Sequence, residues 1–119
     1  MGKVTSLSET ISINLLDSPE IQRKQFRKGV KSDLSRLRKR NLEVFEDVNY
    51  NHVDEFIEIY NENMKRVEAK PSYFFPKEYY SKLFNSKDLD ARLFFIKDQG
   101  KLIAGSIGLF TNDIIQYHL

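Results

Sequence analysis

Alternating apolar and polar side chains indicate β-strands near both ends of the chain. In residues 9–16 (ETISINLL), Ile11, Ile13 and Leu15 alternate with polar residues, and residues 114–119 (IIQYHL) again alternate with a period of two. This period is typical of a strand with one buried face. We therefore expect a strand at 9–16 and a final strand at 114–119.

Three further segments have the composition of strands. Residues 42–48 alternate in the same way, and the apolar segments 91–97 and 101–110 are separated only by the tripeptide DQG at 98–100. A glycine in so short a connection suits the left-handed position of a hairpin that contains a bulge. The last strands are therefore expected to form an antiparallel meander.

A period of 3.6 residues predicts helices between these strands. Ser18 is suited to an N-cap and Pro19 to the first helical position, so one long helix is expected over 19–40, with a bend at Gly29. Its apolar stripe consists of Phe26, Val30, Leu34 and Leu37.

Two more helices are expected in the middle of the chain. Asn51 can cap the first, and Pro76 can open a shorter second one. The apolar face of the first contains Val53, Phe56, Ile57, Tyr60, Met64 and Val67, and the second carries Tyr79, Tyr80, Leu83 and Phe84. The order of elements predicts an α+β fold in a single domain over 9–119, after a disordered N-terminus at 1–8.

Composition narrows the chemistry. The 119 residues have the size of one domain and include no cysteine and only two histidines, His52 and His118. Disulfides and thiolate metal sites are therefore excluded, no metal site is expected, and a reducing, cytoplasmic location fits. No apolar run approaches the roughly 20 residues that span a bilayer, so no transmembrane segment is expected.

Positive charge is concentrated in the first predicted helix. Segment 19–40 contains nine Lys or Arg residues and two acidic residues. Such a helix can bind an anion, and tRNA phosphate, a lipid-linked pyrophosphate and an acidic membrane surface are all suitable. The alternative is a solvated helix face. The candidate anion-binding residues are Arg23, Lys24, Arg27, Lys28, Lys31, Arg36 and Arg38.

The order of several segments resembles a known family. These segments are RKGVKSDLSRLRKR (27–40), IYNENMKR (59–66), YFFPKEYYSKL (73–83) and LFFIKDQGKLIAGSIGLF (93–110), followed by YHL. In this order they resemble the FemAB-like branch of the GNAT acyltransferases. The resemblance implies transfer of an acyl or aminoacyl group to an amine acceptor, with acyl-CoA or aminoacyl-tRNA as co-substrate.

The resemblance also implies that the chain is the N-terminal part of the fold, truncated after the last meander strand. In the GNAT fold a glycine-rich turn after that strand holds the donor pyrophosphate, and this sequence ends before it. The donor motif is then expected beyond residue 119, no cofactor is expected to bind this chain, and the fragment alone is expected to be inactive. Two rivals stay open: a non-enzymatic module that binds nucleic acid or anionic lipid through helix 19–40, and a homodimer formed through an open sheet edge.

Five residues are candidates for the acceptor site. In the resembled family the loop between the two middle helices shapes the acceptor pocket, which points to Tyr73, Tyr79 and Tyr80; the alternative is that they pack in the core. Ser106 lies in a stretch of small residues that lets a ligand approach closely, or that forms a bulge. His118 is a candidate general base because histidine titrates near neutral pH, although a lone histidine in a strand is commonly structural.

Overall fold

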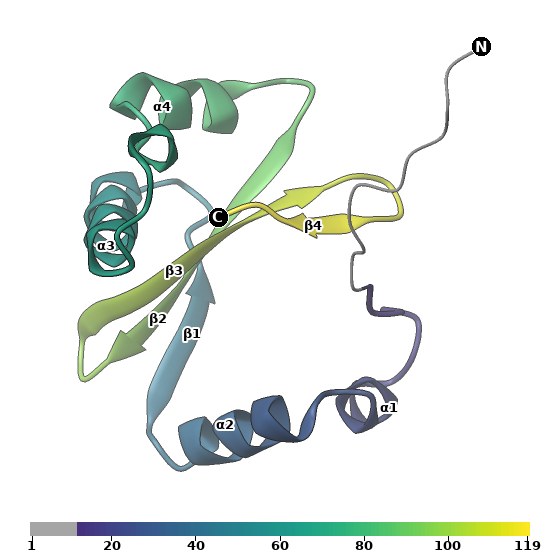
Figure 1. Cartoon of the computed structure of the whole chain (residues 1–119). Coiled ribbons are helices and arrows are strands. Elements are labelled where there is room, and N and C mark those ends of the chain that lie inside the picture. Colours follow the sequence, from purple (N-terminus) through teal and green to yellow (C-terminus); the bar gives the residue numbers. More distant parts are fainter. Residues whose placement is uncertain (1–11) are drawn as a thin grey trace, which may run out of the picture. The chain divides into compact units, whose positions relative to one another are not determined.

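The computed structural model describes residues 12–119 (Figure 1). The chain divides into two compact units, unit 1 ending at Arg40 and unit 2 spanning Asn41–Leu119, where the sequence suggested one domain. The expected disorder of residues 1–8 lies outside the described residues.

Unit 1 contains two helices, α1 (Pro19–Lys24) and α2 (Lys28–Arg38). Ser18 caps α1 as expected, because its Oγ accepts a hydrogen bond from the backbone N–H of Ile21 at 3.3 Å. The prediction of one long helix over 19–40 is wrong: the helix is interrupted at 25–27, and Gly29 lies inside α2 rather than at the bend.

Repulsion between like charges disfavours a continuous helix here. A continuous helix would place Arg23 one turn from Arg27, and Lys24 one turn from Lys28. Like charges four residues apart destabilise a helix by about 0.2–0.5 kcal/mol per pair. The extended backbone at Arg27, with φ −60° and ψ 150°, removes both pairings and begins a new helix.

The prediction of a strand at 9–16 is wrong for residues 12–16, which have no strand structure; residues 9–11 lie outside the described residues. Asn14 provides the physical reason. Its Oδ1 accepts from Leu16 N at 3.1 Å and its backbone carbonyl accepts from Asp17 N at 3.2 Å. Asparagine thus closes a local turn that competes with the extended conformation.

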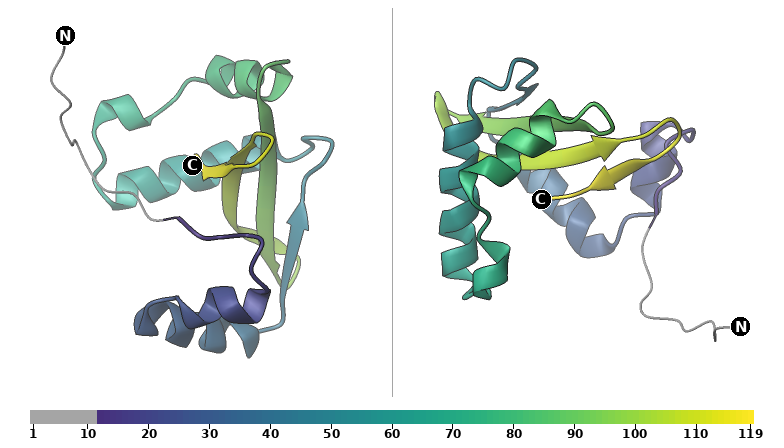
Figure 2. Two further views of the ribbon diagram at one scale, coloured as in Figure 1. Left: turned by 90° about the vertical axis from the view of Figure 1, so that its right-hand side faces the viewer. Right: turned by 90° about the horizontal axis from the view of Figure 1, so that it is seen from above.

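Unit 2 is built on a four-stranded antiparallel sheet in the order β1-β2-β3-β4 (Figures 1 and 2). Its strands are β1 (Leu42–Glu46), β2 (Asp90–Asp98), β3 (Lys101–Phe110) and β4 (Ile115–Tyr117). Since helices and an antiparallel sheet occur in one chain, the α+β class is confirmed.

The β2–β3 hairpin turns over two residues. Asp98 pairs directly with Lys101, and the intervening Gln99 and Gly100 have φ of 51° and 80°. Two consecutive positive φ values are the signature of a type I′ turn, which matches the twist of the flanking strands. The expected bulge is present, but it lies inside the hairpin, at the register shift between Ile96 and Lys97.

Two helices cover one face of this sheet (Figure 2). Helix α3 (Val53–Arg66) packs against β3, and α4 (Lys77–Asn85) packs against β2. A short 3-10 helix, η1 (Pro71–Tyr73), lies between them in the chain. The core they enclose consists of Phe56, Tyr60, Tyr80, Leu83, Ala91, Leu93, Phe95 and Ile107. No helix within residues 12–119 has the length and apolar character needed to cross a membrane.

A buried carboxylate fixes the start of α3. Asp47 is only 5% exposed, and its two oxygens accept from Asn51 N at 3.0 Å and from His52 N at 2.7 Å. His52 occupies the N-cap position without a side-chain capping bond. The expected cap at Asn51 is therefore replaced by a carboxylate from the end of β1, which satisfies two backbone donors at once.

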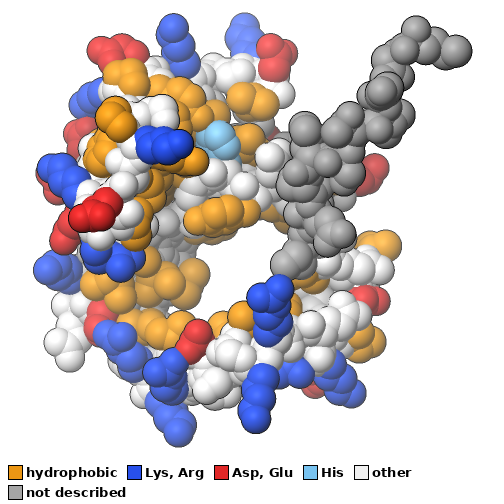
Figure 3. Space-filling view, viewed as in Figure 1, with side chains coloured by type: hydrophobic (Ala, Val, Ile, Leu, Met, Phe, Trp, Pro, Cys, Tyr) orange, Lys and Arg blue, Asp and Glu red, His pale blue; other side chains and the backbone are white. Residues whose placement is uncertain are grey.

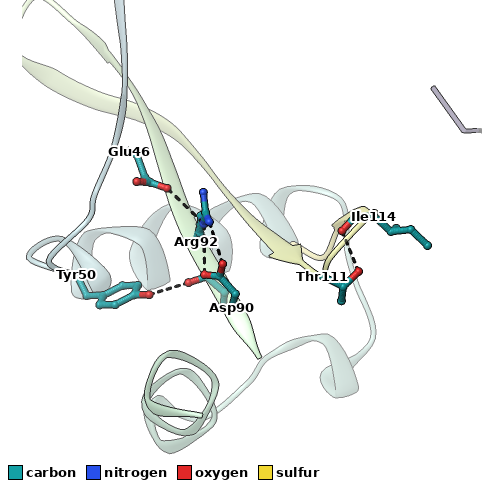
Figure 4. Close-up of polar contacts among 7 residues, drawn as sticks. Glu46, Tyr50, Asp90, Arg92, Thr111 and Ile114 are labelled. Carbon is teal, nitrogen blue, oxygen red and sulfur yellow. Dashed lines mark hydrogen bonds and ion pairs between the residues drawn. The ribbon is translucent and has the colours of Figure 1, made fainter. Parts of the chain in front are cut away.

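Polar contacts at one end of β2 tie the sheet to its neighbouring segments (Figure 4). Arg92 binds Asp90 at 2.9 Å, approaches Glu46 at 3.9 Å and lies 4.1 Å from the centre of the Phe110 ring. The hydrogen bond from Arg92 lowers the pKa of Asp90. The hydroxyl of Tyr50 donates to the carbonyl of Ala91 at 2.7 Å, which holds the loop after β1.

Candidate functional site

Unit 2 contains a cavity of about 720 Å³ between α3, η1, β3 and the C-terminal residues. A cavity of this size is in the range of small-molecule sites. Figure 3 shows hydrophobic side chains gathered over α3 and α4, with Lys and Arg around them. The residues that line this cavity include Tyr60, Tyr73, Gly105, Tyr117 and His118.

Backbone hydrogen bonds hold His118 beside the cavity. His118 N donates to Ile107 O at 2.9 Å, and Ile107 N donates to Leu119 O at 2.8 Å. The same Leu119 carbonyl also accepts from Ser106 Oγ at 3.1 Å. Pairing with β3 therefore continues past Tyr117, and it positions the imidazole on an edge strand.

The structure brings two of the predicted site residues together. The hydroxyl of Tyr79 lies 2.6 Å from His118 Nε2, a short hydrogen bond between residues that are 39 positions apart. The two rings also stack, with centroids 6.2 Å apart. On its other side Tyr79 stacks on Phe75 at 4.4 Å, which restricts the phenol to this orientation.

Other tyrosines are close to this pair. Tyr60 lines the cavity from α3, and burial is the main cause that raises its pKa, with smaller contributions from Tyr73, Tyr79 and Tyr117. A raised pKa keeps the Tyr60 hydroxyl protonated at neutral pH, so it can donate a hydrogen bond. The cavity therefore combines an imidazole with several hydroxyl groups.

Of the other three predicted acceptor residues, Tyr73 lines the cavity, whereas Tyr80 and Ser106 are not among its lining residues. Tyr80 is fully buried in the core, and burial is the largest cause of its raised pKa. Ser106 uses its hydroxyl to hold the Leu119 carbonyl. Tyr73 is 53% exposed and lines the cavity from η1.

Charged groups also line the cavity. Arg66 and Lys101 bring positive charge, and Glu62 brings a carboxylate. One guanidinium nitrogen of Arg66 donates to Asn63 Oδ1 at 2.7 Å. Sequence reasoning missed these residues together with Tyr60 and Tyr117, because the helix period identifies Tyr60 only as core and gives exposed charges no distinguishing signal.

All seven predicted anion-binding residues lie in unit 1. Arg23 and Lys24 are in the last turn of α1, Arg27 is the N-cap residue of α2, and the other four are on α2. Two of them have intramolecular partners: Arg36 pairs with Asp33, and Lys31 Nζ donates to Lys24 O at 2.9 Å. Figure 3 shows Lys and Arg side chains projecting along α2.

Within residues 12–119 no group of three or more His, Asp or Glu side chains is arranged to hold a metal ion. The lining of the cavity supplies an imidazole, hydroxyls and separate charges. An imidazole can accept a proton, and hydroxyls can orient a polar substrate.

Comparison with known proteins gives no match: no protein-family model matches the chain, and no curated protein matches it.

Proposed function

We propose that unit 2 carries the amine-acceptor site of an acyl- or aminoacyl-transferase of the GNAT/FemAB type. The observation that carries this proposal is the hydrogen bond of 2.6 Å between Tyr79 and His118, at the edge of a cavity of about 720 Å³. The resemblance of the sequence to that family supports the same function. The donor would be acyl-CoA or aminoacyl-tRNA, and the proposal assigns no donor-binding residue to this chain.

The reaction requires a group that accepts a proton. When an amine attacks the carbonyl of a thioester or ester, a C–N bond forms and the amine loses a proton, while the C–S or C–O bond breaks with its electron pair going to the leaving thiolate or alkoxide, which then takes up a proton. His118 lines the cavity and can accept that proton. The rest of the catalytic effect would come from holding the two reacting groups in position.

The direction of the hydrogen bond with Tyr79 decides which ring nitrogen of His118 is available. The Tyr79 hydroxyl contacts Nε2 of His118. In the tautomer in which Nε2–H donates to the Tyr79 oxygen, the lone pair of Nδ1 is left to accept a proton. Tyr79 is thus a positioning residue, and His118 is the proposed base.

Histidine NMR tests the proposal without a donor. The probe is Nα-acetyl-lysine methylamide, and its Nε-acetylated form, which has no free amine, is the control. We expect a saturable shift of the His118 ring resonances with the amine only. Tyr79→Phe should weaken that binding by about threefold to tenfold, the range for one lost hydrogen bond.

His52 provides an internal reference, because its ring packs edge-on against Phe45 and Phe95 rather than lining the cavity. Its resonances should stay unchanged throughout the titration. Equal shifts of His118 with the amine and with its acetylated form, or no shift with either, would refute the assignment of an amine-acceptor site.

A further inference from the structure

Unit 1 exposes large apolar side chains together with many cations. Neither α1 nor α2 contains a buried residue. Leu16 is 96% exposed, and Ile21, Val30 and Leu37 are each more than 40% exposed. Isolated exposed apolar residues are common, but a segment that buries none of its residues gains little stability from its own packing.

The apolar residues of α2 lie along one side of the helix. Successive residues of an α-helix are 100° apart, so Val30, Leu34 and Leu37 form one stripe. Lys31 and Arg38 lie next to this stripe along one of its edges, and Lys28 lies on the opposite side of the helix. Long basic side chains next to an apolar stripe can extend their charged ends away from it.

This pattern distinguishes between two anionic partners. A nucleic acid would neutralise the cations, but it would leave Val30 and Leu37 in water, and within residues 12–40 the one aromatic side chain is Phe26. Nucleic-acid strands are commonly held by aromatic stacking as well as charge. A membrane interface accepts both features, because apolar side chains enter the acyl boundary while Lys and Arg bind headgroups.

We propose that α2, with the adjoining part of unit 1, binds the surface of a membrane that contains anionic lipids. Val30 and Leu37 insert at the boundary between headgroups and acyl chains, and Lys31 and Arg38 contact the headgroup phosphates. This interaction surface is independent of the proposed acceptor site in unit 2.

Sedimentation of the full chain with lipid vesicles tests the proposal. Vesicles of phosphatidylcholine mixed with phosphatidylglycerol are compared with vesicles of phosphatidylcholine alone. We expect binding to the mixed vesicles, weaker at high salt, and little binding to the neutral ones. Equal binding to both, or none to the mixed vesicles at low salt, would overturn the proposal.

Paired variants separate the apolar contribution from the charge. Val30→Ser combined with Leu37→Ser should lower the partition coefficient at least about tenfold, because two apolar side chains no longer leave water. Val44→Ser on β1 is the matched control, since Val44 is 69% exposed and lies outside unit 1. Arg38→Gln should lower the partition coefficient roughly fivefold, whereas Lys28→Gln, on the opposite side of the helix, should lower it less.

Binding of a tRNA, followed by fluorescence anisotropy, completes the test. If unit 1 is a nucleic-acid site, the Val30→Ser and Leu37→Ser double variant binds tRNA as tightly as the wild type and still binds mixed vesicles undiminished. That pair of results would overturn the lipid assignment. A loss of vesicle binding in the double variant, with helical content unchanged in circular dichroism, would support it.

Discussion

Two adjacent tyrosines of α4 have opposite surroundings. The hydroxyl of Tyr79 contacts His118 Nε2, whereas the hydroxyl of Tyr80 is buried and has no hydrogen-bond partner in the part of the chain that the structure describes. The ring of Tyr80 packs edge-on against Phe56 and Phe75. Tyr80 therefore contributes its ring to the core, and its hydroxyl is a cost to stability.

Replacing Tyr80 by Phe tests this cost. The variant keeps the ring and removes a buried polar group without a partner, so the free energy of unfolding should rise by about 1 kcal/mol. Urea unfolding followed by circular dichroism measures it. Tyr79→Phe is the matched control, because it removes a hydroxyl that is hydrogen-bonded, and it should lower stability or leave it unchanged. A loss of stability in Tyr80→Phe larger than in Tyr79→Phe would contradict this assignment.

Because of Tyr80, the free energy of unfolding should also depend on pH in the alkaline range. Burial raises the pKa of Tyr80 above its ordinary value of 10.0, and that of Tyr60 is also raised. As pH rises above about 10, the unfolded chain releases these protons while the folded chain still holds them, so the free energy of unfolding decreases. Unfolding curves measured on both sides of pH 10 should show this decrease, and the slope should be smaller in Tyr80→Phe. An unchanged slope would mean that Tyr80 is not the group responsible.

At the scale of elements, α3 approaches β3 at Gly105, which has no side chain. A Cβ atom on Gly105 would lie 2.8 Å from Cδ2 of Phe56 and 3.2 Å from the ring of Phe95. Both rings are about 1% exposed, so they have little room to move. Gly105 thus allows the helix to approach the sheet closely and contributes backbone to the cavity wall.

Gly105→Ala should therefore destabilise unit 2 by about 1–3 kcal/mol, the range for an overpacked core. Gly108→Ala is the control on the same strand, because the nearest atom to its Cβ is at 3.1 Å on the ring of Phe110, which is only partly buried. Thermal unfolding of both variants compares the two sites. If Gly105→Ala is no less stable than Gly108→Ala, α3 does not pack against β3 as described.

The connection between β1 and α3 depends on one buried carboxylate. Asp47→Ala leaves the N–H groups of Asn51 and His52 without their acceptors, so a loss of about 2 kcal/mol is expected. Asp47→Asn keeps one acceptor oxygen and should lose less. Glu43→Ala, an exposed change on the same strand, should be close to neutral. Denaturant unfolding of the three variants should give that order of stability, and any other order would contradict the capping role of Asp47.

Local sequence patterns predicted most of the helices and strands, and they failed where side-chain interactions determine the local structure. Strand alternation located β1 and β4, the apolar segments on either side of a short turn located β2 and β3, and the helix period located α3 and α4. Alternation alone could not show that Asn14 closes a turn, nor could the apolar stripe of 19–40 show the break at 25–27, which repulsion between cations favours. Both errors arise from side-chain interactions to which a hydrophobic pattern is insensitive.

The candidate site was predictable only in part, for a related reason. The resemblance pointed to Tyr79 and residue chemistry to His118, each separately, but their contact depends on how α4 and the C-terminal strand pack on the sheet. Tyr60 fitted the core stripe of α3, and its position in the cavity follows from the same packing. Contacts between distant segments carry no local signal in a single sequence.

For the whole molecule, the distribution of buried residues between the two units determines stability. Every residue of the hydrophobic core belongs to unit 2, whereas α1 and α2 contain no buried residue. A helix of 11 residues such as α2 is marginal in water without tertiary packing. Unit 1 should therefore open without unfolding of unit 2.

Hydrogen exchange of the full chain measures this difference directly. Amides of α2 should exchange with little protection, whereas the paired amides of β2 and β3 should exchange only by opening unit 2 as a whole, since both strands lie in the core. A chain that begins at Asn41 should then have the same free energy of unfolding as the full chain, to within about 0.5 kcal/mol. Anionic vesicles should protect α2 and leave β2 unchanged, because only the segment that binds lipid gains protection. Equal protection of α2 and β2 without lipid would show instead that the two units unfold cooperatively, and the independence of unit 1 would have to be abandoned.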